Sequence, residues 1–266
     1  MVAICTGLAL GGGANALTIV TIRTLGVVAL FLAYFRFAGV GINLQGRETR
    51  IAIAIGILLA LNNYAINESL AHIPVPLAIL VFYLWPAIAS AASWLLGKER
   101  FRWRGLAGLA LAFAGVGLAL NVEFTAAQEV GIALALLAAC AWSATFLLVG
   151  HFFHGRDTRP ATFTMTATAA VIFVVVTAVT RDVMLPGTAA GWTGIAGVPL
   201  FYAFAMIGLF AATVTLGPAK TGFFMNFEPI ATVLLSALIL GQNLAPVQLA
   251  GAALVIAALF LFRPLK

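Results

Sequence analysis

Nine apolar stretches, each long enough to cross a bilayer as a helix, follow one another along this chain with only short polar interruptions. They occupy residues 16–38, 51–71, 75–97, 105–121, 130–152, 160–180, 192–216, 218–240 and 245–262. Backbone polar groups in lipid must bond within the protein, and the period-2 alternation of a barrel strand is absent. The sequence therefore predicts an all-α polytopic membrane protein.

The composition excludes a soluble protein, because 63% of the residues are hydrophobic, 8% are charged and the mean hydropathy is +1.12. Soluble domains carry about 25% charged residues. The net charge of +6 does not indicate nucleic-acid binding, because the basic residues lie between the apolar stretches and form no stripe. Cys5 and Cys140 lie in apolar segments and predict no disulfide framework.

The basic residues predict an orientation. With the 39–50 loop in the cytoplasm, every lysine and arginine except Arg23 and Arg181 lies on the cytoplasmic side. The C-terminus is then cytoplasmic. Arg23 enters its span from the outer side, where its side chain is expected to extend to the lipid head groups; the alternative is a gating salt bridge with Glu68.

An internal duplication relates the two halves of the chain. Superposing Pro86 on Pro229 brings Leu106-Ala107-Gly108 onto Leu249-Ala250-Gly251. We predict two inverted repeats of five helices, residues 1–125 and 126–266, within one membrane domain. Such pairs place the substrate site near the midplane between the repeats. Only a stub, residues 1–10, stands for the first helix, so we expect the chain to begin inside that helix; the alternative is a nine-helix protein.

Glu228 is the sharpest candidate for a functional residue, because it lies in the middle of an apolar span. A charge at this depth costs about 2.5–3.5 kcal/mol or more, so it should face a cavity or a partner. Thr221, Met225, Thr232 and Ser236 share its helix face at spacings of three and four. Glu228 is a candidate for binding a substrate ammonium and for coupling to protons; the alternative is a hydrogen bond that fixes helix packing.

Tyr83 and Trp85 lie at mid-membrane, away from the interfaces where such rings usually gather. We expect them to line a cavity and bind a substrate by cation–π attraction or stacking, with Pro86 kinking the helix and freeing the carbonyl of Phe82. The alternative is aromatic core packing at a kink.

Further substrate-binding candidates lie on other spans. The span over residues 51–71, the third helix when the stub is counted, is unusually polar and carries Asn62, Asn63 and Tyr64. Asparagines in lipid also serve as links between helices, and that alternative stays open for Asn62 and Asn63. Trp142 and Tyr202 are two more aromatic residues that we expect to reach the cavity.

The chain resembles the drug/metabolite transporter superfamily, EamA type. Three segments carry the resemblance: Asn226-Phe227-Glu228-Pro229, Leu249-Ala250-Gly251-Ala252-Ala253-Leu254 and Gly97-Lys98-Glu99-Arg100 before Gly105-Leu106-Ala107-Gly108. Tyr83-Leu84-Trp85-Pro86 resembles the fourth helix of bacterial aromatic amino acid exporters of the YddG kind. The resemblance implies ten helices, location in the bacterial inner membrane, alternating access and efflux of small metabolites.

The sequence thus predicts a secondary transporter, not an enzyme, that exports amino acids, with aromatic or large apolar ones preferred. The alternatives are efflux of other small metabolites or lipophilic cationic drugs, and, in other classes, a channel or an intramembrane enzyme. No nucleotide-binding loop, metal-ligand cluster or nucleophile elbow is recognisable, so we expect no cofactor and no metal. The expected partners are a small-molecule substrate and the bilayer; the oligomeric state stays open, a monomer included.

Overall fold

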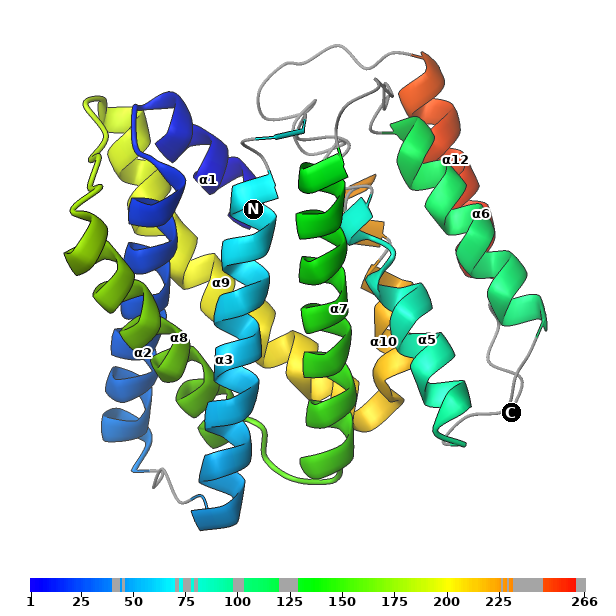
Figure 1. The fold of residues 1–266 in the computed structure, drawn as a ribbon, viewed down its shortest axis with the longest axis horizontal. Helices are drawn as coiled ribbons and strands as arrows, with labels where there is room; N and C mark the ends of the chain where they lie inside the picture. The colour runs from blue at the N-terminus through cyan, green and yellow to red at the C-terminus, as the bar shows by residue number, and fades with distance from the viewer. Residues whose placement is uncertain are drawn as a thin grey trace. The chain divides into compact units, whose positions relative to one another are not determined.

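The structure, a computed structural model, describes residues 1–39, 44, 46–69, 72–73, 78, 81–97, 103–119, 129–225, 227–228, 230–231 and 246–261. Every regular element in these ranges is an α-helix, as predicted (Figure 1). The helices are α1 Val2–Gly11, α2 Ala16–Ala38, α3 Gly46–Ser69, α5 Trp85–Leu95, α6 Trp103–Ala119, α7 Glu129–Phe152, α8 Arg159–Thr180, α9 Ala189–Leu216, α10 Pro218–Met225 and α12 Pro246–Leu261.

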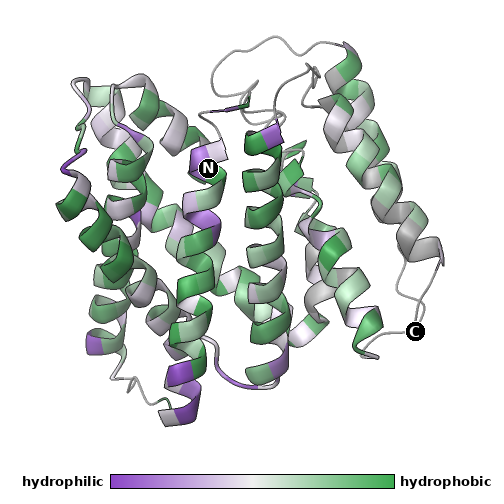
Figure 2. Ribbon diagram, in the orientation of Figure 1, coloured by the Kyte–Doolittle hydropathy of each residue, from purple (hydrophilic) through white to green (hydrophobic). Residues whose placement is uncertain are grey.

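Five of these helices, α2, α3, α7, α8 and α9, are long and apolar enough to cross a membrane. Their bounds lie close to the predicted spans. Figure 2 shows apolar residues around these helices and hydrophilic ones gathered mainly at helix ends and in the C-terminal half of α3. The stub predicted at residues 1–10 forms the short helix α1. The chain is therefore a multi-pass helical membrane protein.

The helices group into two compact units that cut across the predicted repeats. Unit 1 contains residues 1–63 and 148–215, and unit 2 contains residues 64–147 and 216–266. Each unit therefore takes helices from both halves of the sequence. The boundaries fall inside α3 and α7 and at the end of α9.

Unit 1 is held together by close helix approaches at small residues. A Cβ at Gly26 of α2 would lie 2.6 Å from the Pro199 ring of α9, and one at Gly56 of α3 would lie 2.6 Å from the Met165 carbonyl oxygen of α8. Small residues allow helix backbones to meet closely where lipid provides no hydrophobic drive. A second α9 glycine, Gly194, touches α1 in the same way, with the Cys5 carbonyl oxygen 2.5 Å from where a Cβ would stand.

Unit 2 contains two helix pairs. The predicted spans 105–121 and 245–262 correspond to α6 and α12, which pack along each other (Figure 1). The shorter helices α5 and α10 form the other pair. In the predicted 218–240 span, residues 226, 229 and 232–240 lie outside the described residues, and Pro229, Thr232 and Ser236 are among them.

Several threonines of α8 donate hydrogen bonds to the backbone of their own helix. Thr162, Thr164 and Thr168 each donate to the carbonyl four residues earlier, at 2.8, 3.0 and 2.9 Å. This is the packing role expected of threonine within a helix. Thr166 differs, because its buried hydroxyl has no hydrogen-bond partner in the part of the chain that the structure describes.

Candidate functional site

The candidate residues fall into two constellations, one in each compact unit, and each is described by itself. Unit 2 contains Tyr83, Trp85, Trp142, Glu228 and also Tyr64. Unit 1 contains Asn62, Asn63 and Tyr202.

The unit 2 constellation is built at a helix break. The sequence predicts one kinked helix over 75–97, but the described part is interrupted: Val81 and Phe82 are helical, Tyr83 and Leu84 form a turn, and α5 begins at Trp85. The expectation of a continuous helix is therefore wrong at this point. Pro86 has no N–H for the carbonyl four residues earlier, and proline suits the first turn of a helix, so a new helix starts here.

The break brings Tyr83 to the carboxylate of Glu228. The Tyr83 hydroxyl donates a hydrogen bond of 3.2 Å to Oε2 of Glu228. Tyr83 is largely buried, whereas Glu228 is exposed at the surface of its unit. A carboxylate within a membrane span that is not covered by its own unit must meet water, a partner group or a ligand. One oxygen of Glu228 is thus fixed by a phenol, while part of the residue is exposed at the surface.

Aromatic rings pack behind this pair. Trp85 lies 4.5 Å from Phe146 between ring centroids, and Trp142 lies 5.4 Å from Phe146 and 6.4 Å from Phe82. Phe82 meets Tyr83 edge-on at 6.0 Å. We call these five side chains the aromatic cluster.

The start of α5 is bonded to α7. The Ser143 hydroxyl lies 2.7 Å from the carbonyl oxygen of Trp85 and 2.7 Å from that of Ala139. This contact fixes the helix break against α7. Trp85 is 1% exposed, so it lies in the packed interior, and a substrate would touch it only after other side chains move. Tyr64 is 53% exposed on α3. The substrate contacts expected of Trp85, Trp142 and Tyr64 stay predictions.

The unit 1 constellation centres on a residue that the sequence analysis placed elsewhere. Arg23 of α2 donates from Nη2 to Oδ1 of Asn63 on α3. Its guanidinium carbon also lies 4.3 Å from the ring centroid of Tyr202 on α9, a cation–π distance. The expectation that Arg23 extends to the lipid head groups is therefore wrong, because its charged end is held by two side chains of its own unit.

Asn63 is itself fixed within α3. Its Nδ2 donates to the Leu59 carbonyl oxygen at 2.7 Å, which leaves Oδ1 for Arg23. Asn63 and its neighbour Asn62 are 8% and 5% exposed. The link between helices that was the alternative for the asparagines is thus present for Asn63. Sequence reasoning missed Arg23 although the signal existed: a lone cation inside an apolar span.

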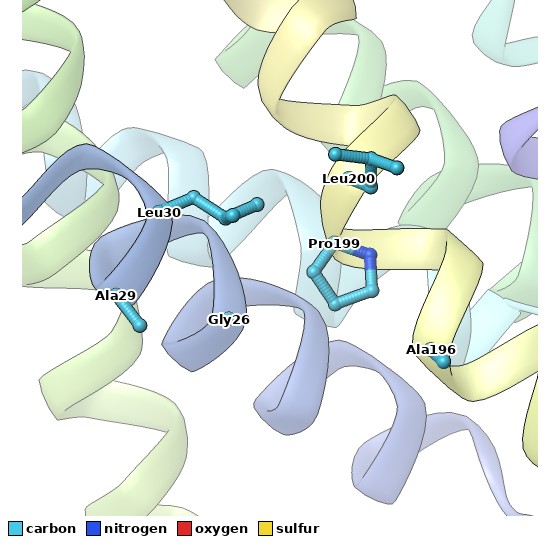
Figure 3. A pocket seen from close by; sticks show the side chains of 6 residues that line it. All are labelled: Gly26, Ala29, Leu30, Ala196, Pro199 and Leu200. Atoms are coloured by element: carbon cyan, nitrogen blue, oxygen red, sulfur yellow. The ribbon is translucent and has the colours of Figure 1, made fainter. Parts of the chain in front are cut away.

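Unit 1 also has an apolar groove between α2 and α9, with a volume of about 460 Å³ (Figure 3). It is lined by Gly26, Ala29, Leu30, Ala196, Pro199 and Leu200. The lining offers no charged or hydrogen-bonding side chain, so the groove suits acyl chains and does not provide a site for a charged substrate.

Comparison with known proteins agrees with the fold and defines the class. The sequence matches the EamA-like transporter family over residues 2–121 and again over residues 129–263. A search among curated proteins finds no significant match. Twenty-nine chains of solved structures match. One of them, a crystal structure, superposes with a TM-score of 0.78 at 20% identity, over 98% of this chain and 93% of that one. The similarity to that structure concerns the fold alone.

Two matches that together cover nearly the whole chain place it among membrane transporters. The chain belongs to the EamA-like transporter family. The predicted resemblance to EamA-type transporters is thereby confirmed.

Proposed function

We propose that this protein is a secondary transporter of the bacterial inner membrane that exports amino acids, preferably those with aromatic or large apolar side chains. Transport proceeds by alternating access, and the C-terminus is cytoplasmic. Family membership supports the transporter class, and the excess of basic residues on one side of the spans supports the orientation.

The observation that carries the proposal is the hydrogen bond from Tyr83 to Glu228 at the helix break. An accessible carboxylate held beside an aromatic ring offers an ammonium group both an ion pair and a cation–π surface. Interrupted helices are a common way for transporters to present polar groups at membrane depth. Glu228 is also titratable, so it is the candidate for coupling export to a proton gradient.

The aromatic cluster suggests the side chain of the cargo. Rings prefer offset or edge-on partners. In the aromatic cluster, Phe82 is half-buried, Tyr83 and Trp142 are each 8% exposed, and Trp85 and Phe146 are fully buried. We assign Tyr83 and Trp142 to the cargo's apolar part, with Trp85 as support for their position. Asn62, Asn63, Tyr64 and Tyr202 remain candidates for polar contacts with a cargo.

A lipophilic cation is the second candidate cargo. A carboxylate beside aromatic rings suits an organic cation as well as an amino acid, and the same Tyr83–Glu228 pair favours it. The two candidate cargoes differ in that an amino acid carries a carboxylate, which a lipophilic cation lacks.

The test is radiolabelled phenylalanine flux in proteoliposomes of the purified protein, with and without an imposed pH gradient. We expect saturable flux that unlabelled tryptophan inhibits more strongly than tetraphenylphosphonium. We also expect Glu228→Gln to abolish the dependence on the gradient. No flux above empty liposomes from a monodisperse protein would sink the phenylalanine assignment, and inhibition by tetraphenylphosphonium alone would favour the cationic cargo.

A further inference from the structure

Arg23 is a cation within a membrane-spanning helix. It is the eighth residue of α2, which places it roughly 10 Å along the helix from its start at Ala16. Charged residues at such depth are rare, and they mark a functional site unless a partner explains them. The partners of Arg23 therefore decide how it is to be understood.

The partners found are neutral. Asn63 accepts one hydrogen bond from Nη2, and Tyr202 covers the guanidinium with its ring. Neither removes the charge. Because Asn63 is tied to Leu59 and Tyr202 lies mid-way along α9, the guanidinium is held from two sides in a defined orientation.

No carboxylate neutralises Arg23 among the described residues of its own unit. Glu48 pairs with Arg156, and Asp157 pairs with Arg159. Asp182 is exposed after the end of α8. The positive charge of Arg23 is thus positioned without an acidic partner in this unit.

One donor of the guanidinium is also unused. Nε of Arg23 is buried and has no hydrogen-bond partner among the described residues, although the side chain as a whole is only half-buried. Nε and the adjacent Nη2 form an edge of the guanidinium that matches the two oxygens of a carboxylate. Because Nε is buried and Nη2 already donates to Asn63, a carboxylate reaches this edge only after neighbouring side chains move. A purely structural link between helices would gain from pairing this N–H.

We propose that Arg23, supported by Asn63 and Tyr202, binds the carboxylate of the transported substrate. This inference rests on the transport function proposed above and concerns the constellation of unit 1 alone. The planar fork can hold either a carboxylate or a phosphate, and the single positive charge of Arg23 is balanced by the single negative charge of a carboxylate. Arg23 contacts the ligand. Asn63 and Tyr202, which are candidates for polar contacts above, here act by positioning Arg23.

The test measures apparent ligand affinity from the rise in Tm of the purified protein in neutral detergent. The ligands are phenylalanine, 3-phenylpropionate, which lacks the ammonium, phenethylamine, which lacks the carboxylate, and inorganic phosphate. For the wild type we expect the two carboxylates to raise Tm, phenethylamine to bind at least about tenfold more weakly than phenylalanine, and phosphate to have no effect.

The decisive variant is Asn63→Asp, which preserves the shape of the side chain and supplies Arg23 with an internal carboxylate. We expect this protein to be at least as stable as the wild type without ligand, yet to lose the response to both carboxylates. Arg23→Gln should lose the same response, and Arg23→Lys should retain part of it. If Asn63→Asp responds to 3-phenylpropionate as the wild type does, the inference is wrong.

The outcomes separate this inference from the proposed function. Absence of phenylalanine flux together with an Arg23-dependent response to 3-phenylpropionate would overturn the aromatic amino acid cargo and retain the carboxylate site. Saturable phenylalanine flux with phenethylamine bound as tightly as phenylalanine would retain the aromatic amino acid cargo and overturn the carboxylate site. A response to phosphate as large as that to carboxylates would show a general anion site and contradict the carboxylate assignment.

Discussion

Tyr202 in unit 1 and Tyr83 in unit 2 each hold a charged side chain, but with opposite parts of the phenol. The ring face of Tyr202 lies over the guanidinium of Arg23, whereas the hydroxyl of Tyr83 donates to the carboxylate of Glu228. The face of an aromatic ring is electron-rich and the hydroxyl is a donor, so one residue type supports both a cation and an anion. The comparison teaches that the role of a tyrosine in a membrane protein depends on which part of its side chain makes the contact, the ring face or the hydroxyl.

The largest effect should come from the packing behind Tyr83. Trp85→Ala removes a ring that is 1% exposed and packed on Phe146. We expect the free energy of unfolding to fall by about 3 kcal/mol, which is the lower end of the range for buried aromatic residues. The loss is at the lower end because the unfolded chain in a membrane also finds apolar contacts. Trp192→Ala, at a tryptophan that is 48% exposed, is the matched control and should be nearly neutral. Equal melting temperatures for both variants in detergent would show that the aromatic cluster is not a support.

Removing the negative charge in unit 2 should have the next largest effect. Glu228→Gln can still accept the hydrogen bond from Tyr83 but can no longer form an ion pair with an ammonium. We expect phenylalanine flux to fall about a hundredfold, equivalent to about 2.7 kcal/mol. The exposed carboxylate of Glu129 provides the control, and Glu129→Gln should leave flux unchanged. Wild-type flux in Glu228→Gln would leave the carboxylate with a packing role only.

The contrast between the two tyrosines is tested by the same substitution at each. Tyr83→Phe deletes the hydroxyl that bonds to Glu228, and we expect flux to fall about tenfold because a hydrogen bond to a charged group is lost. Tyr202→Phe keeps the ring face over Arg23 and should change flux less than about twofold. Proteoliposome initial rates measure both. A larger loss in Tyr202→Phe than in Tyr83→Phe would reverse the proposed roles.

The smallest effect concerns an ion pair outside the membrane. Arg159 donates hydrogen bonds of 2.9 and 2.6 Å from its side chain to Asp157, and these hold the pKa of that carboxyl below its usual range. The stabilisation is present above the unfolded pKa, near 3.8, and is lost as the pH falls through the lower folded value.

Because both side chains are well exposed, this pair should contribute less than about 1 kcal/mol. We expect Asp157→Asn to melt slightly below the wild type at pH 6, with the difference closing towards pH 3. Asp182→Asn, at another exposed carboxylate, is the control and should show no such convergence. A melting-temperature difference between Asp157→Asn and the wild type that grows as the pH falls would contradict the predicted direction of the pH dependence.

The positions of the helices could be predicted from the sequence because length and hydropathy alone decide where a membrane helix fits. The break before Pro86 was predicted only as a kink, since the chemistry of proline allows either a kinked helix or a new helix start. Glu228 and Tyr83 each stood out as polar groups at depth. The hydrogen bond between them could not be predicted from the sequence, because it joins residues 145 positions apart in the chain.

Arg23 shows most clearly what could not be predicted from the sequence. The sequence gives its depth and charge, but the choice between head groups and an internal partner depends on helix rotation. That rotation is set by close contacts such as the one between Gly26 and Pro199. A period of 3.6 residues does not fix which face of an all-apolar helix turns inward.

The most direct test of the central claim is whether Arg23 in unit 1 recognises a carboxylate and Glu228 in unit 2 recognises an ammonium, each independently of the other. The measurement is inhibition of phenylalanine flux by phenethylamine and by 3-phenylpropionate in the wild type, Arg23→Gln and Glu228→Gln. The account predicts that Arg23→Gln loses inhibition by 3-phenylpropionate and retains that by phenethylamine, while Glu228→Gln shows the opposite pattern. If both variants lose inhibition by both analogues equally, or neither variant changes it, the claim is contradicted.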